Sequence, residues 1–171
     1  DQPSADGGKC RSIEILVGFG VGGGTDLFAR NTAQAMSKAV GTPVQVLNLT
    51  AGNGIAAYRE LMNRPADGCT LLALTSAHVV LSTLQPDDIN LSALTYLVRA
   101  HEELGLLVGR AGQQDQQFKG LVKAASDEQR ALTIGGTGAR SFDRAVVDYV
   151  LADSAIDYRY ISYGGSKSMH S

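Results

Sequence analysis

Short apolar runs alternate along the chain with longer segments in which apolar residues recur at helical spacing. Thr25–Val40 shows the helical pattern most clearly, because its apolar side chains fall along one side and Gly41 follows as a stop signal. The short runs predict strands at Ile13–Phe19, Val44–Leu47, Thr70–Thr75, Leu94–Ala100, Leu104–Val108, Leu132–Ile134 and Tyr158–Ile161. The helical pattern predicts helices at Thr25–Val40, Ile55–Met62, Phe118–Ala125 and Phe142–Leu151.

This alternation of strands and helices indicates an α/β fold with mostly parallel, doubly wound sheets. Ligands of such sheets bind at the carboxyl ends of the strands. Those ends read GFGVGGGTD, NLTAGNG, LTSAH, GGTGARS and SYGGSKS, and they are rich in Gly, Ser and Thr. Such residues are ordinary turn and cap residues, but their convergence on one edge favours a binding site that uses backbone N–H groups and hydroxyls.

Composition narrows the class of function. The 15 Lys and Arg residues nearly balance the 17 Asp and Glu residues, which argues against a nucleic-acid or charged membrane surface. No apolar stretch approaches the roughly 20 residues of a membrane span. The polar opening DQPSADGGK fits either a cytoplasmic start or a mature terminus after processing.

Catalytic and metal-binding motifs are not found in the sequence. His78, His101 and His170 lie at no metal-ligand spacing, and neither G-x-S-x-G nor C-x-x-C occurs. For His78, two interpretations stay open, a cap or loop residue after the third strand and a ligand contact. We expect no metal, no cofactor and no enzymatic activity.

The glycine loop after the first strand fits a dinucleotide motif by spacing alone. Gly18, Gly20 and Gly23 match G-x-G-x-x-G, but the acidic residue expected roughly 20 positions on is missing, since no Asp or Glu lies between Asp26 and Glu60. We therefore interpret the segment from 22 to 25 as a cradle of N–H groups for a carboxylate at a positive helix end. Asp26 is expected to cap that helix or to interact favourably with its dipole, or to meet an amine or hydroxyl of the ligand.

The two cysteines precede strands that are expected to be parallel neighbours. Cys10 lies just before the first strand and Cys69 just before the third, so both sulfurs fall at one end of the sheet. We predict a structural disulfide, typical of an oxidising compartment. Two unrelated thiols are the alternative.

Arg140 follows a glycine-rich strand end, at the expected start of a helix. A guanidinium there would hold a ligand carboxylate through two hydrogen bonds. The alternative is a surface arginine that pairs with Asp143 or Asp148.

Five blocks of the sequence, taken together and in this order, resemble a known family. ILVGFGVGGGTDLFAR, GTPVQVLN, ADGCTLLALTSA, LTIGGTGARSFD and ISYGGS are similar to blocks of the periplasmic substrate-binding proteins of tripartite tricarboxylate transporters. Gly18 stands where that family usually has proline. The loop Asn48–Gly54 reads NLTAGNG where the family usually has NRPGAGG, so the residues that select the ligand differ here.

The resemblance implies two α/β lobes that close on a small carboxylate, which the chain would deliver to membrane components of a transporter from the periplasm. It implies a first lobe at 1–103 and the N-terminal part of a second at 104–171, with the second lobe incomplete, so self-association through that lobe is a further expectation. Nucleic acid is not an expected partner. A cofactor-binding enzyme and a shortened relative that binds a protein partner are the alternatives. The implied ligand-binding residues are Phe19, Gly22, Gly23, Gly24, Thr25, Asp26, Gly52, Asn53, Thr75, Ser76, Thr137, Gly138, Ala139, Arg140, Ser141, Tyr163, Gly164, Gly165 and Ser166.

Overall fold

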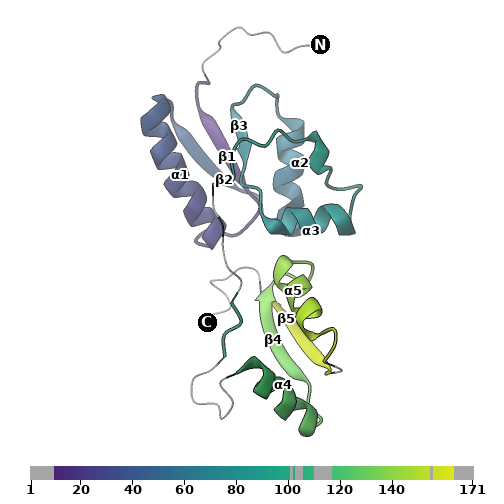
Figure 1. The fold of residues 1–171 in the computed structure, drawn as a ribbon. Helices are drawn as coiled ribbons and strands as arrows, with labels where there is room; N and C mark the ends of the chain where they lie inside the picture. The colour runs from purple at the N-terminus through teal and green to yellow at the C-terminus, as the bar shows by residue number, and fades with distance from the viewer. Residues whose placement is uncertain (1–9, 101, 103–105, 110–116, 155, 164–171) are drawn as a thin grey trace.

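The computed structural model describes residues 10–100, 102, 106–109, 117–154 and 156–163. Its first sheet contains three parallel strands in the order β2-β1-β3 (Figure 1). The strands are β1 at Ile13–Val17, β2 at Val44–Asn48 and β3 at Thr70–Leu72. The helices around it are α1 at Gly24–Val40, α2 at Ile55–Asn63 and α3 at Ser76–Leu84.

The central strand β1 is covered on both sides, which explains why four of its five residues are apolar. Ile15 and Val17 point to one face, where Ala29 and Ala33 of α1 pack against them. On the opposite face, Tyr58 of α2 and Leu81 of α3 form a second cluster with Ile89, and Leu72 of β3 packs against it. The small alanines bring α1 close to the sheet and fix where its N-terminus lies.

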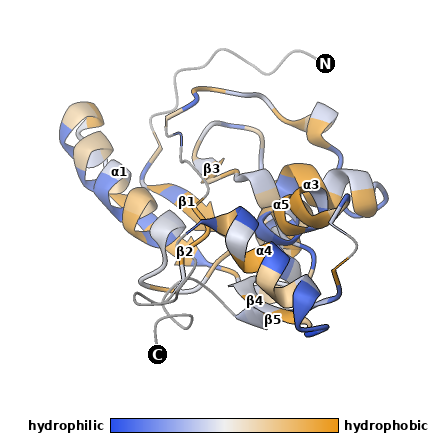
Figure 2. Ribbon diagram, turned by 60° about the horizontal axis from the view of Figure 1, so that its bottom comes forward, coloured by the Kyte–Doolittle hydropathy of each residue, from blue (hydrophilic) through white to orange (hydrophobic). Residues whose placement is uncertain are grey.

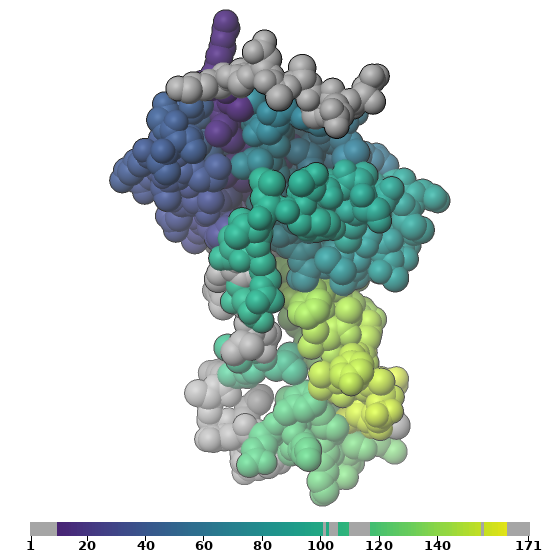
Figure 3. Space-filling view, turned by 45° about the horizontal axis from the view of Figure 1, so that its top comes forward, coloured from purple at the N-terminus to yellow at the C-terminus, as the bar shows by residue number. Residues whose placement is uncertain are grey.

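A second, two-stranded parallel sheet lies in the C-terminal half, where β4 at Leu132–Thr137 pairs with β5 at Tyr158–Tyr163. It is accompanied by α4 at Phe118–Asp127 and α5 at Phe142–Leu151. Short 3₁₀ turns occur at Ala51–Gly54 and Leu91–Ala93. Helices α3 and α5 lie side by side (Figure 2). The part of the chain built on the first sheet, purple to teal in Figure 3, contacts the part built on the second sheet, green to yellow, at these two helices.

The structure confirms the α/β class and the parallel strands. It corrects two predicted strands, because Leu94–Ala100 and the described residues 106–108 are not strands. An apolar run becomes a strand only when another backbone pairs with it, and Tyr96, Leu97 and Val98 are 63%, 71% and 79% exposed. Helix α3 was not predicted, since its apolar, partly β-branched sequence lacks a clear helical period. The predicted boundary between residues 103 and 104 touches residues outside those described.

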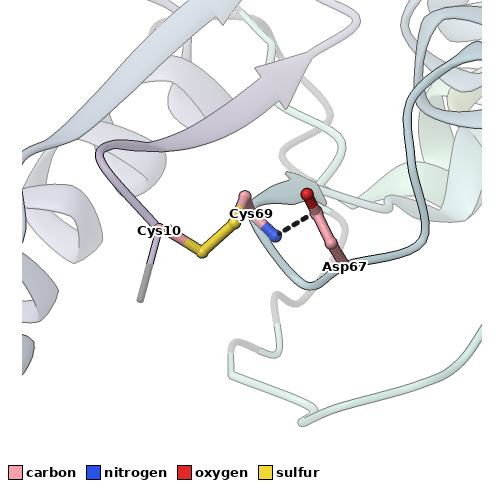
Figure 4. Close-up of a disulfide and its surroundings, with 3 residues drawn as sticks. All are labelled: Cys10, Asp67 and Cys69. Carbon is pink, nitrogen blue, oxygen red and sulfur yellow. Dashed lines mark hydrogen bonds between the residues drawn. A yellow bond between two sulfur atoms is a disulfide. The ribbon is translucent and has the colours of Figure 1, made fainter. Parts of the chain in front are cut away.

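The predicted disulfide between Cys10 and Cys69 is present, with Cα atoms 5.6 Å apart (Figure 4). Strands β1 and β3 pair in parallel, so the residues just before them share one end of the sheet. The Cys69 N–H also donates to Asp67 Oδ1 at 2.9 Å, which shapes the turn into β3. The bond therefore ties the N-terminal segment to the sheet at the end opposite the glycine loops.

Candidate functional site

Loops that follow β1, β2 and β3 pack on one another at the carboxyl end of the first sheet. A Cβ added at Gly18, just after β1, would lie 2.4 Å from the Cα of Gly54. A Cβ on Gly54 would lie 2.6 Å from Nε2 of His78 in α3. Only glycine fits at these two positions, because backbone and imidazole occupy the space of a side chain. The three strand-end loops therefore meet at one place, as predicted.

The glycine loop is held from inside by Asp26, which is 1% exposed. Its Oδ2 accepts hydrogen bonds from the Gly22 N–H at 2.8 Å and from Arg30 Nε at 2.9 Å. Its Oδ1 accepts from Asn48 Nδ2 at 2.9 Å, and the same amide also donates to the Phe19 carbonyl. Both carboxylate oxygens are thus engaged within the protein.

These contacts keep Asp26 ionised. The hydrogen bond from Arg30 lowers the pKa of Asp26 from 3.8 to about 2 against the opposing effect of burial, and the bonds from Gly22 and Asn48 add to the lowering. The Gly22 N–H and the Gly23 N–H, which donates to the Gly20 carbonyl, are used inside the loop. They are therefore not free to hold an anion of either kind. This agrees with rejecting the dinucleotide motif, but it also corrects the predicted cradle at 22–25, in which the N–H groups of Gly22 and Gly23 are already used.

The N-terminus of α1 has no side-chain cap. Gly23 is the N-cap, so of the two roles predicted for Asp26 the cap is wrong. Asp26 lies in the first turn, where its negative charge interacts favourably with the helix dipole. Gly23 offers no side chain to the first N–H groups of the helix. The N–H groups of Gly24 and Thr25, in the first turn, have no acceptor within the helix. Gly23 and Thr25 are half-buried.

The loop after β3 is fixed by a reciprocal cap. Thr75 is the N-cap of α3, its side chain accepts from the backbone of His78, and the Thr75 N–H donates to His78 Nδ1 at 3.1 Å. His78 is completely buried, its ring meets the Phe19 ring edge-on, and burial lowers the pKa of its imidazole. Its Nε2 has no hydrogen-bond partner among the described residues. Of the two interpretations of His78, the structure therefore shows the cap, and Ser76 begins the helix.

The loop after β4 is built in the same way. Ser141 is the N-cap of α5 and accepts from the Arg144 N–H at 3.2 Å. The Thr137 hydroxyl and N–H both donate to Asp143 Oδ2, at 2.6 and 2.8 Å. Gly138, at φ 64°, donates its N–H to the Tyr163 carbonyl at 3.1 Å. Tyr163 is the last described residue of this part of the chain, so the predicted Gly164, Gly165 and Ser166 lie outside the described residues.

Arg140 is exposed and lines a groove of about 390 Å³ between α3 and α5. The groove is lined by Val80, Leu84, Ala139, Arg140, Ser141, Arg144, Ala145 and Asp148. The alternative partners Asp143 and Asp148 bond to Thr137 and Arg144 instead. Within the described part of the chain Arg140 has no ion-pair partner, so its role as a carboxylate ligand stays a prediction.

The loops of the two bodies meet where Asn53 lies against Gly138. A Cβ added at Gly138 would lie 2.8 Å from Asn53 Nδ2 and 3.1 Å from its Oδ1. The structure therefore brings the predicted residues of the second and fourth strand-end loops together. Ala139 and Arg140, which follow Gly138, line the groove along α5.

Sequence reasoning missed the residues that hold the glycine loop in shape. Arg30 and Asn48 carry the hydrogen bonds to Asp26, and Gly54 carries the packing onto His78. The four-residue separation of Asp26 and Arg30 on a helix was a signal that could have found the first pair. Across the described residues no group of three or more His, Cys, Asp or Glu could hold a metal ion, and no helix there is long and apolar enough to cross a membrane.

Comparison with known proteins extends these findings, although no family profile matches the chain. A UPF0065 protein of Bordetella pertussis is 23% identical over 163 residues, which cover 94% of this chain and 50% of that protein. Protein BugT of the same organism is 36% identical over 74 residues, which cover 43% of this chain and 23% of BugT. The chain thus spans about half the length of the full relatives that it matches.

Solved structures share the fold. The periplasmic binding protein BugD superposes with a TM-score of 0.69 at 18% identity, over 94% of this chain and 54% of BugD. Rpa4515 of R. palustris, solved with adipate, gives 0.68 at 19% identity over 95% of this chain and 55% of that one. MatC from Rhodopseudomonas palustris, solved with malate, superposes with a TM-score of 0.66 at 20% identity, over 95% of this chain and 56% of MatC.

The chain has the fold of the periplasmic binding protein BugD, of which it matches about half. In sequence, the chain is similar to the UPF0065 and Bug proteins of Bordetella pertussis. The family resemblance in the sequence is thereby confirmed. Among the structural neighbours, BugD is a periplasmic binding protein and a TctC protein from Polaromonas is a solute-binding protein.

Proposed function

We propose that the chain is part of a periplasmic solute receptor that binds a small carboxylate between two lobes and presents it to a membrane transporter. Two structural neighbours were solved with adipate and with malate, which are dicarboxylates. The relatives are periplasmic binding proteins, and a disulfide suits an oxidising compartment such as the periplasm. The ligand, the transporter and the location are proposals for this chain.

One observation carries the proposal. Glycine-rich loops from both sheets meet at the carboxyl ends of their strands, where Asn53 lies against Gly138. On the first-lobe side the α1 N-terminus has no side-chain cap. Unpaired N–H groups at a positive helix end are the donors that a carboxylate takes. Asp26 is already paired with Arg30, so its charge is balanced where an anion would bind.

In this proposal the chain's residues bind and orient but transfer no proton. The first-turn N–H groups of Gly24 and Thr25 donate to one ligand carboxylate. Asp26 acts as a positioning residue, because its carboxylate is buried beneath the loop and holds the Gly22 N–H and Asn48. Closure of the second lobe would then exclude water from the ligand and strengthen these hydrogen bonds.

Isothermal titration calorimetry and thermal-shift measurements of the purified chain test the proposal with malate, adipate, citrate, NAD and ATP. We expect stabilisation by at least one of the carboxylates and none by NAD or ATP. Stabilisation by NAD or ATP alone would show that the glycine loop binds a nucleotide and that the proposal is wrong.

A matched pair of variants tests the location of the site. A Cβ added at Gly24 or at Gly20 meets no atom within 4 Å, so the fold should tolerate alanine at both positions. Gly24→Ala places a methyl group at the open helix end and is expected to weaken carboxylate binding about tenfold, equal to about 1.4 kcal/mol. Gly20→Ala lies outside the proposed contacts and is expected to bind as the wild type does. Equal affinities for the two variants would place the carboxylate elsewhere.

A further inference from the structure

Asn53 has an unusual backbone conformation for a residue with a side chain. Its φ is 54° and its ψ 35°, and its neighbours Gly52 and Gly54 also have positive φ, at 67° and 108°. The left-handed region is disfavoured for residues other than glycine, although Asn tolerates it better than most. Strained residues of this kind cluster at ligand-binding sites, where the surrounding structure imposes the conformation.

The base of this loop is held firmly. Gly54 is buried and packs between the Gly18 backbone and the imidazole of His78, leaving no space even for a methyl group. Gly52 packs against the Ile55 side chain, 3.1 Å from a Cβ built on that glycine. With both neighbours fixed, the direction of the Asn53 side chain is set by the loop and not by its own rotamer alone.

The Asn53 side chain leaves the first lobe and reaches the second. A Cβ built at Gly138 would lie 2.8 Å from Nδ2, 3.1 Å from Oδ1 and 3.2 Å from Cγ, so the whole carboxamide lies against the Gly138 backbone. Gly138 itself is left-handed, at φ 64°, and its N–H donates to the Tyr163 carbonyl. The loops on both sides of this contact thus carry glycines with positive φ, and the edge of the Asn53 carboxamide lies close to the Gly138 backbone.

Asn53 is half-buried, and the hydrogen-bonding capacity of its carboxamide is unused. Among the described residues, neither Nδ2 nor Oδ1 of Asn53 has a hydrogen-bond partner, in contrast to the amide of Asn48 nearby. Neither atom is among the buried polar atoms that lack a partner, so both remain accessible to a ligand. A carboxylate between the lobes would supply an acceptor for the Nδ2 donor.

We propose that Asn53 is a specificity-determining residue, which lies between the lobes at Gly138 and donates from Nδ2 to one carboxylate of the bound solute. The inference rests on the proposed carboxylate-binding function. It assigns to one side chain the recognition of a negatively charged group, because Nδ2 is a donor and an aspartate of the same shape would present only acceptors.

The test is calorimetric titration of the wild type, Asn53→Asp and Asn53→Gly with malate and with adipate. Asn53→Asp keeps the shape but replaces the donor with a negative charge, and we expect it to lower the affinity for the better ligand about 30-fold or more. Asn53→Gly removes the donor and also relieves the backbone strain. We expect it to lower the affinity about three- to tenfold while raising the Tm by about 1–3 °C.

Asn63→Asp is the matched control. Asn63 is exposed at the end of α2. This variant therefore makes the same change of charge away from the contact between Asn53 and Gly138, and it is expected to bind as the wild type does. Thermal unfolding of each variant checks that it is folded. If Asn53→Asp fails to fold, Asn53→Gly decides, since glycine is compatible with the observed φ.

The possible results separate the two proposals. If the wild type binds a dicarboxylate and both Asn53 variants bind it within twofold, the role of Asn53 is wrong while the carboxylate receptor stands. If the wild type binds neither dicarboxylate nor citrate, both proposals are overturned. A loss in Asn53→Asp that Asn63→Asp reproduces would reveal a general effect of charge, and it would overturn the role of Asn53.

Discussion

Replacing Asp26 with Asn is expected to destabilise the first lobe markedly, although the two side chains have the same shape. The hydrogen bond from Arg30 and the smaller contributions of Gly22 and Asn48 lower the pKa of Asp26 from 3.8 to about 2. Each pKa unit corresponds to about 1.36 kcal/mol, so the lowering represents about 2 kcal/mol of stability at neutral pH. This is an upper value, because the Arg30 side chain is 47% exposed and solvent screens its charge.

The amide adds a second cost. Both oxygens of Asp26 accept hydrogen bonds from Gly22, Arg30 and Asn48, so the amide nitrogen of Asn would face donors on one side. A buried donor that loses its acceptor costs about 1–3 kcal/mol. With the screened charge, we expect Asp26→Asn to lower the free energy of unfolding by about 2–3 kcal/mol.

Urea unfolding followed by far-UV circular dichroism measures this loss. With a slope of about 2 kcal/mol per molar urea, the midpoint should fall by about 1–1.5 M at pH 7. The folded-state pKa of Asp26 is below the unfolded value, so its stabilisation is present above pH 3.8 and is lost as the pH falls towards 2. The difference between wild type and variant should therefore shrink over that window.

Asp127→Asn is the control for this measurement. Asp127 forms an exposed ion pair with Lys123 at the same four-residue separation, and exposed helix pairs of this kind contribute at most about 0.5 kcal/mol. If Asp26→Asn costs no more than this control, or if its effect is unchanged between pH 4 and pH 2, the reasoning about the buried network fails.

Three further predictions concern stability. The disulfide joins residues separated by 59 positions in the sequence. Cys69→Ser, or reduction of the wild type with dithiothreitol, should therefore lower the free energy of unfolding by about 4 kcal/mol, because the unfolded chain gains loop entropy. A shift of the urea midpoint below about 0.5 M would contradict this prediction. Gly18→Ala should cost about 2–3 kcal/mol because its Cβ would lie 2.4 Å from Gly54, whereas Gly20→Ala meets no atom and should be nearly neutral in the same assay. Burial lowers the pKa of His78 in the folded state. The contribution of His78 to stability should therefore be complete above the unfolded pKa of 6.5 and decline as the pH falls below it. The Tm of His78→Asn should accordingly depend less on pH between about pH 7.5 and pH 5 than the Tm of the wild type does.

Much of the first lobe could be predicted from the sequence. The run Ile13–Val17 is mostly apolar without regular alternation, which marks a strand buried on both faces, and β1 is the central strand. Helix α1 begins one residue before the predicted start and ends at Val40, because glycines on both sides are strong local signals. The disulfide followed from the order of parallel strands alone, since neighbouring strands fix which residues share an end.

The same local reasoning failed where pairing or packing decides. Leu94–Ala100 has the composition of a strand, yet no described strand pairs with it, and strand formation depends on a partner that can come from anywhere in the fold. Helix α3 has a mixed apolar pattern, and what marks its start is the reciprocal contact of Thr75 with His78. That contact depends on side-chain direction, which spacing does not provide.

For the candidate site, the sequence by itself determined which loops lie at the carboxyl edge and that they carry glycines and hydroxyls in place of acid–base groups. Only the tertiary structure decided what each residue does there. It buries Asp26 beneath the loop with Arg30 and Asn48, and it sets Asn53 against Gly138. Asn48 and Gly138 lie far from their partners in the sequence and on different elements. A local pattern carries no record of which backbones approach closely enough to exclude a side chain.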